Sequence, residues 1–175
     1  MIITTPTTHT FVTGASEGFT PLNAFDAALL DAGIGNTNLI KVSSIVPPGS
    51  REFPVSQLAL PPGSLVPVAY ASMESDIPGS IICAAIAAAW SEDSAQPGLI
   101  MEYNAHGHRE DAEAVVRRMA QEGLKARDWP VHRIQSVSID HRVIKIGAVF
   151  AAVVLTGASP ADDEADFIDS TGSEE

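Results

Sequence analysis

The chain has 175 residues, the length of one compact domain, which is enough to bury a hydrophobic core. Hydrophobic residues make up 45% of it and charged residues 18%, an ordinary balance for a globular protein. The formal net charge of −12 argues against a nucleic-acid partner, because binding to phosphates requires a basic surface.

The sequence predicts a soluble, cytoplasmic protein. The first ten residues, MIITTPTTHT, lack the charged start and apolar core of a signal peptide. No uncharged apolar run reaches the ~18 residues that a membrane span needs. Cys83 is the only cysteine, which excludes an intrachain disulfide and a cysteine-based metal cluster. Its apolar neighbours predict an inert, buried thiol.

The first predicted elements are a strand and a helix. A β-branched and aromatic run predicts a strand at residues 10–13, and a loop is expected at 16–18. Thr20 suits the N-cap of a helix, Pro21 its first position and Gly33 its exit. The side chains at helical spacing that we expect to be buried are Leu22, Phe25, Leu29 and Leu30.

A second short strand, at 39–42, leads into two adjacent serines. Prolines then predict loops at 47–50 and 60–63, and a longer strand is expected from 65 to 73. The segment 80–90 is ambiguous, because its alanines favour a helix whereas hairpin spacing favours a strand. We interpret it as a strand.

The last predicted elements are a strand at 98–103, a helix at 109–127, and two apolar strands at 134–143 and 146–155 that pair as a hairpin. Antiparallel strands with at least two helices indicate an α+β layered architecture. The side chains expected on the buried side of the second helix are Ala112, Val115, Val116, Met119 and Leu124.

An acidic tail follows the predicted domain, which spans residues 1–160. Residues 161–175 contain no basic residue, and such a composition predicts a disordered, solvated segment. The acidic residues of this tail are Asp162, Asp163, Glu164, Asp166, Asp169, Glu174 and Glu175.

The serine pair Ser43-Ser44 gains interest from its position between a strand and a proline-bounded loop. A strained junction of this kind is where a backbone carbonyl becomes open to attack. The Ser44 hydroxyl would attack the carbonyl of Ser43 and convert the peptide into an ester. Elimination would release a chain that ends at Ser43 and leave dehydroalanine at 44, which would hydrate and lose ammonia to become a pyruvoyl group.

A pyruvoyl carbonyl would form a Schiff base with an amino acid and accept the electron density that is left when CO₂ departs. A protonated acid must then return a proton to Cα before the amine leaves. The chemistry therefore requires a carboxyl group close to position 44.

Several stretches of the chain resemble pyruvoyl-dependent arginine decarboxylases. The resemblance covers residues 10–156 and implies an α/β/β/α sandwich with mainly antiparallel sheets. It also implies a precursor that splits into a β chain, 1–43, and an α chain, 44–175. The implied assembly is a trimer or hexamer with active sites at subunit boundaries. The matching stretches are EGFTPLNAFD at 17–26, AGIGNTNLIKVSSIVPP at 32–48, LVP at 65–67 and GLIMEY at 98–103.

The resemblance assigns processing roles to three residues. Ser44 matches the precursor of the covalent pyruvoyl cofactor, and Ser43 matches the residue before the cut. Asn38 matches an asparagine that assists processing and borders the cofactor. Ser44 and Asn38 are therefore expected to belong to the catalytic site.

The resemblance also assigns residues that handle the substrate. Glu102 matches the acid that protonates Cα, and its apolar strand would desolvate the carboxyl and favour the protonated form. Asp26 matches the carboxylate that binds the substrate guanidinium, for which a bidentate, charge-assisted pair is well suited. Leu22 and Gly35 match residues that line the pocket. The implied reaction converts L-arginine to agmatine and CO₂.

Plainer interpretations exist for each of these features. Asp26 is also typical of a solvated helix surface, and Glu102 of a strand at a sheet edge. His106 and His108 form an HxH pair, but no third ligand is evident nearby and the implied chemistry needs no metal. Two alternative functions remain. One is the same reaction on another amino acid, and the other is a non-processing homologue that serves as a structural or regulatory subunit.

Overall fold

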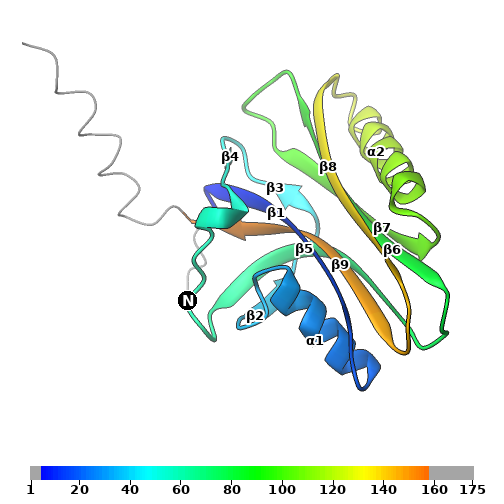
Figure 1. Ribbon diagram of the computed structural model, residues 1–175. Helices are drawn as coiled ribbons and strands as arrows, with labels where there is room; N and C mark the ends of the chain where they lie inside the picture. Colours follow the sequence, from blue (N-terminus) through cyan, green and yellow to red (C-terminus); the bar gives the residue numbers. More distant parts are fainter. Residues whose placement is uncertain (1–4, 158–175) are drawn as a thin grey trace, which may run out of the picture.

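Two mostly antiparallel β-sheets lie face to face, and one helix covers the outer side of each (Figure 1). The computed structural model describes residues 5–157, so the predicted acidic tail lies outside the described residues. The elements are β1 (Thr8–Glu17), α1 (Pro21–Asp31), β2 (Asn38–Lys41), β3 (Ile45–Val46), β4 (Arg51–Glu52), the short 3₁₀ helix η1 (Val55–Gln57), β5 (Leu65–Ser75), β6 (Ile81–Ser91), β7 (Gly98–His106), α2 (Arg109–Lys125), β8 (Val131–Arg142) and β9 (Gly147–Thr156).

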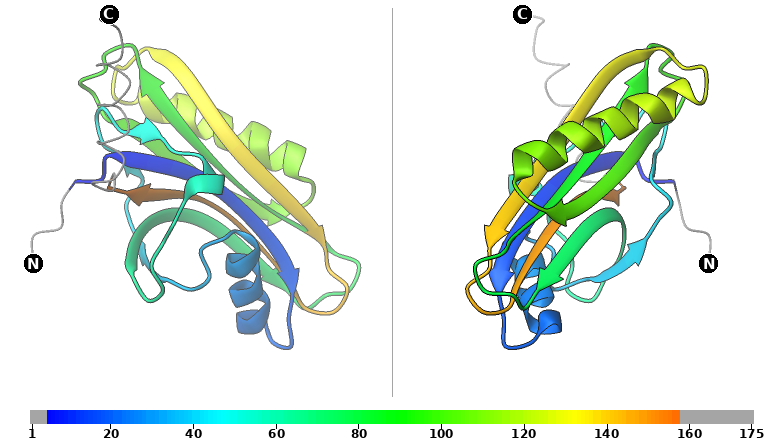
Figure 2. Two further views of the ribbon diagram at one scale, coloured as in Figure 1. Left: turned by 60° about the vertical axis from the view of Figure 1, so that its left-hand side comes forward. Right: turned by 90° about the vertical axis from the view of Figure 1, so that its right-hand side faces the viewer.

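The sheet topology confirms the predicted α+β class. The first sheet has the strand order β2-β5-β9-β1-β4, and the second has the order β3-β7-β6-β8. Only the pairs β1–β4 and β2–β5 of the described strands are parallel. With α1 outside the first sheet and α2 outside the second, the layers follow the order α/β/β/α (Figure 2). Within residues 5–157, no helix combines the length and the apolar character needed to cross a membrane.

The alanine-rich segment is strand β6, as interpreted from the sequence. Its residues from Ile82 to Ala89 are all buried, because the strand lies in the middle of the second sheet with a layer on each face. One face packs against the first sheet, and the other packs against the buried side of α2. Small side chains on both faces allow the layers to approach closely, which explains alanine in a strand. The helix residues in this contact are Ala112, Val116, Ala120 and Leu124.

The predicted hairpin of the last two strands is wrong. β8 pairs with β6 in the second sheet, whereas β9 lies between β1 and β5 in the first. The short connection at 143–146 therefore crosses between the layers. β9 is buried from Gly147 to Leu155, and such a strand needs a neighbour on each edge and a layer over each face. The central position of β9 in the first sheet gives it a strand on each edge, and it lies between α1 and the second sheet.

Helix α1 begins as predicted, but only two of the four side chains expected to be buried face the core: Leu29 is buried and Phe25 packs against the buried cluster. Thr20 caps it, with its hydroxyl oxygen accepting the Asn23 N–H at 3.2 Å. The buried side consists of small residues and one leucine, namely Ala24, Ala28 and Leu29, whereas Leu22 is 74% exposed and Leu30 53%. The alanines allow the helix to lie so close to β1 that a Cβ on Gly14 would clash with the Ala28 carbonyl. Leu22 and Leu30 point away from the sheet.

Glu17 joins the end of β1 to the crossing between β8 and β9. Residues 16 and 17 belong to the strand, where a loop was predicted. The Glu17 carboxylate accepts the backbone N–H groups of Ile144 (2.9 Å), Lys145 (2.8 Å) and Ile146 (3.0 Å) and pairs with His141 Nε2 (2.6 Å). Burial opposes its ionisation, but these hydrogen bonds prevail and lower the pKa of Glu17 to about 2.

We expect Glu17→Gln to lower the free energy of unfolding by about 2 kcal/mol at pH 7, since hydrogen bonds to a charged group are lost. The folded pKa lies below the ordinary glutamate value of 4.5, so the carboxylate stabilises the fold fully above pH 4.5 and loses this effect as the pH falls toward 2. Urea unfolding of the variant and wild type should therefore converge over that range. Exposed Glu74 supplies the control variant Glu74→Gln. A constant difference across this pH range would contradict the assignment.

Candidate active site

The chain passes from the first sheet to the second at the serine pair. The end of β2 is held in the first sheet by the Val42 N–H, which donates to the Val68 carbonyl at 3.2 Å. Two residues later the Ser44 carbonyl accepts the Ile100 N–H of β7 at 2.8 Å, in the second sheet. The peptide between Ser43 and Ser44 therefore spans the two layers and is anchored on both sides.

Ser44 has a φ of +63°, in the left-handed region. A residue with a Cβ atom pays roughly 1–2 kcal/mol for this conformation, so the surrounding structure must impose it. The two anchoring hydrogen bonds from separate sheets are the physical source of that constraint. The junction expected to be strained is strained at the second serine.

The Ser44 hydroxyl faces a carboxylate. Its Oγ donates to Glu102 Oε1 at 2.7 Å, within the usual range for a hydrogen bond to an ionised acceptor. Glu102 lies on β7 two residues after Ile100, and alternation along the strand directs both side chains toward the space between the sheets. The Glu102 side chain is 20% exposed. The carboxylate is thus mostly enclosed, and one of its oxygens contacts the side chain at position 44.

Lys41 is the site residue that the sequence analysis missed. Its Nζ lies 3.0 Å from Glu102 Oε2, so the two carboxylate oxygens have separate partners, Lys41 and Ser44. The apolar neighbours of Glu102 along β7 gave no indication of this charged partner from β2. The signal was present in the sequence: Lys41 is the one charged residue of β2, and only Val42 separates it from the serine pair.

Asn38 lies at the start of β2 and holds a loop. Its side-chain amide donates to the Gly63 carbonyl at 2.9 Å, and its backbone N–H donates to the Ser64 carbonyl at 2.8 Å. None of the contacts found within residues 5–157 joins its side chain to Ser44. Its role in processing stays a prediction.

Asp26, Leu22 and Gly35 do not join Ser44 within one chain. Asp26 and Leu22 lie on the exposed surface of α1, which covers the outer side of the first sheet (Figure 1). Gly35 follows the helix, close to the Leu30 side chain. Ser44 and Glu102 lie where the two sheets meet, so the described residues form two separate groups.

One histidine of the HxH pair, His108, lies near two carboxylates that the sequence analysis did not connect with it. The ligand atoms of His108, Glu110 and Asp140 lie within 4.8 Å of one another. Asp140 already accepts the backbone N–H of Arg109 at 3.0 Å, and Glu110 pairs with the Arg109 guanidinium at 3.2 Å. The carboxylates therefore have partners of their own at the start of α2, and His106 is not part of the group.

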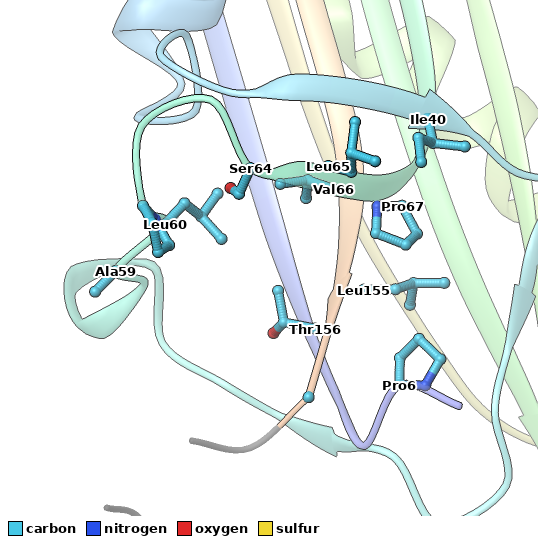
Figure 3. A pocket seen from close by; sticks show the side chains of 12 residues that line it. Pro6, Ile40, Ala59, Leu60, Ser64, Leu65, Val66, Pro67, Leu155 and Thr156 are labelled. Atoms are coloured by element: carbon cyan, nitrogen blue, oxygen red, sulfur yellow. The ribbon is translucent and has the colours of Figure 1, made fainter. Parts of the chain in front are cut away.

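An apolar pocket of about 410 Å³ lies beside β2 and β5 (Figure 3). Its walls include Ile40 and Leu65 from the two strands, together with Leu60 and Ser64 from the loop that Asn38 holds. Neither Ser44 nor Glu102 lines it. The pocket is a separate surface feature next to the edge strand that carries Lys41.

Together, fold and site define a class of protein in which a serine at a strained crossing between two stacked sheets faces an ion-paired carboxylate. Comparison with known families identifies the family. Residues 8–160 match the model of the family described as pyruvoyl-dependent arginine decarboxylase. The chain belongs to this family, whose cofactor is a covalently bound pyruvoyl group.

Individual relatives agree with this match. A pyruvoyl-dependent arginine decarboxylase of Methanocaldococcus jannaschii is 50% identical over 150 residues, which cover 86% of this chain and 90% of the relative. Its counterpart from Methanococcus aeolicus is 47% identical over the same shares of the two chains. That of Pyrococcus abyssi is 44% identical over 153 residues, 87% of this chain and 96% of the relative.

Proposed function

We propose that this chain cuts itself between Ser43 and Ser44, converts Ser44 into the pyruvoyl group, and decarboxylates L-arginine to agmatine and CO₂. The observation that carries the proposal is the Ser44 hydroxyl, held 2.7 Å from Glu102 on a residue with a φ of +63°. A nucleophile, a proton acceptor and a strained peptide thus meet at one position. We infer L-arginine as the substrate from the names of the relatives.

Cleavage begins when Glu102 Oε1 accepts the Ser44 hydroxyl proton and Oγ attacks the carbonyl carbon of Ser43. The C–N bond then breaks, the nitrogen of Ser44 takes up a proton, and an ester joins the two residues. Loss of the Ser44 Cα proton and cleavage of the Cβ–Oγ bond release Ser43 as a carboxylate. Water then replaces the nitrogen at position 44, which leaves as ammonia, and a ketone remains.

The residues around position 44 fit the group that would form there. A pyruvoyl group supplies a carbonyl that accepts the electron pair left by departing CO₂. Glu102 already lies within hydrogen-bonding distance of the side chain at 44, so it is placed to hold a proton and return it to the substrate Cα. The same carboxyl group would serve the cleavage and the later turnover.

Arginine recognition would depend on Asp26 from a neighbouring subunit. A carboxylate binds guanidinium through two parallel, charge-assisted hydrogen bonds. Asp26 lies on the outer helix, away from Ser44 of its own chain, so a second copy must bring the two together. The apolar side chains of Phe19, Leu22 and Leu30 surround this helix surface and are 90%, 74% and 53% exposed. Such a surface favours burial against another subunit in a trimer or hexamer.

The test is the composition of the purified protein and its reaction with amino acids. Denaturing electrophoresis and intact mass should show two chains, 1–43 and 44–175, and hydrazine should react with the start of the larger one. CO₂ release should be fastest with arginine. A single intact chain in folded protein would contradict the pyruvoyl mechanism and favour a non-processing homologue. Faster release from another amino acid would overturn the substrate only.

A further inference from the structure

We propose that Lys41 is a positioning residue for self-cleavage: it holds the Glu102 carboxyl group directed at the Ser44 hydroxyl. This inference rests on the proposed function and adds a residue to it. In this arrangement the ion pair fixes the orientation of the base, and the base takes the proton from the attacking hydroxyl. Lys41 thereby controls how readily the precursor cuts itself.

The first argument is the division of the carboxylate between two partners. Lys41 Nζ lies 3.0 Å from Oε2, and Ser44 Oγ donates to Oε1 at 2.7 Å. An ion pair on one oxygen fixes the orientation of the group and leaves the other oxygen for the serine. A Glu102 without this partner would be free to rotate away from Ser44.

A second argument is that Lys41 is itself held in place. Its ammonium donates to the Tyr70 carbonyl at 2.9 Å and lies 4.4 Å from the centroid of the Tyr70 ring. Cation–π attraction and the hydrogen bond to the Tyr70 carbonyl both hold the Lys41 ammonium in place, although the Lys41 side chain is 53% exposed. A surface lysine normally moves freely, but two contacts with Tyr70 hold this one beside Glu102.

The third argument is the scarcity of other charges on the strands around Glu102. On β6, the residue opposite is Ile86, and the one titratable side chain of that strand, Cys83, packs on the α2 side. β3 has no titratable residue, and β5 carries Tyr70, which contacts Lys41, and exposed Glu74. Among residues 5–157, Lys41 is the cation found within ion-pair distance of Glu102.

The consequence is a defined dependence of cleavage on the side chain at position 41. Without the ammonium, Oε2 loses its partner and the carboxylate is free to turn away from the Ser44 hydroxyl. Loss of Lys41 should therefore slow cleavage, and another cation at 41 that reaches Oε2 should restore it.

The experiment follows cleavage of freshly refolded precursor by denaturing electrophoresis between pH 5 and 9. Lys41→Met removes the charge and keeps the apolar stem, and Lys41→Gln does so with a polar end. Both should cut about 10–100-fold more slowly at pH 7, because the base is no longer held against the attacking hydroxyl. Lys41→Arg should restore the profile of the wild type.

Controls separate this role from stability and from the proposed function. Lys125→Met removes a lysine that is 79% exposed on α2 and should leave the profile unchanged. Thermal unfolding identifies a variant that fails to fold. If either Lys41→Met or Lys41→Gln fails to fold, the other variant tests the inference. Wild-type cleavage together with an unchanged cleavage rate in both variants would overturn the Lys41 inference alone, and so would an Arg variant as slow as Met. Absence of cleavage in the wild type would overturn the proposed function as well.

Discussion

Ser44→Ala should leave one intact chain of 175 residues and no arginine-dependent CO₂ release. Without the hydroxyl, nothing faces Glu102 Oε1 that is able to attack the Ser43 carbonyl, so neither the ester nor the ketone forms. Removal of a nucleophile typically costs at least about 10⁴-fold in rate, and here the cofactor is lost with it. Intact mass after prolonged incubation, together with radiometric CO₂ release, measures both effects.

Ser43→Ala is the matched control for that experiment. The group attacked at position 43 is the backbone carbonyl, which alanine retains, and Ser44 keeps its hydrogen bond to Glu102. This variant should therefore yield two chains. Circular dichroism shows whether each variant is folded, since alanine at 44 meets the same positive φ as serine. Detectable cleavage in Ser44→Ala would refute the serine mechanism.

The second large effect is expected from Glu102→Gln, which keeps the shape of the side chain and removes its ability to exchange a proton. The amide still accepts a hydrogen bond from Ser44 but takes up no proton, so cleavage should slow. In the fraction that does cut, kcat should fall by about 10²–10⁴-fold, the usual contribution of a general acid or base. KM for arginine should change little, because arginine binding is assigned to Asp26.

Separate measurements of cleavage and turnover make this second prediction sharp. A time course of electrophoresis gives the first rate, and CO₂ release normalised to the cleaved chain gives the second. Glu74→Gln, on an exposed position of β5, should match the wild type in both. Normal cleavage with full turnover in Glu102→Gln would remove Glu102 from the mechanism.

Local signals in the sequence predicted the elements well, because those signals act over a few residues. Thr20, Pro21 and Gly33 marked the limits of α1 through capping and backbone geometry alone. The pairing of β8 and β9 was wrong for the opposite reason. A short connection is compatible with a hairpin or with a crossing between layers, and the choice depends on β1, which lies more than a hundred residues earlier.

The site was predicted in part for similar reasons. The serine pair and the acidic residue of GLIMEY were identifiable, whereas their distance of 2.7 Å depends on the stacking of two sheets. Lys41 was not predicted, because the sequence next to Glu102 shows only the apolar neighbours on its own strand. The charge that matters comes from β2, in the other sheet. Asp26 differs again, since its proposed partner belongs to a second copy of the chain.

The position of the serine pair also bears on how the finished protein would lose and regain its structure. A cut at 43–44 leaves the shorter piece with β1, all ten of whose residues pair with β9, and with β2, which pairs with β5. The Lys41–Glu102 ion pair would then join two separate polypeptides. Unfolding would release two molecules instead of one, so recovery would become a second-order association that slows on dilution. In the uncut precursor the same strand pairs form within one chain, so their recovery would carry no such dependence on concentration.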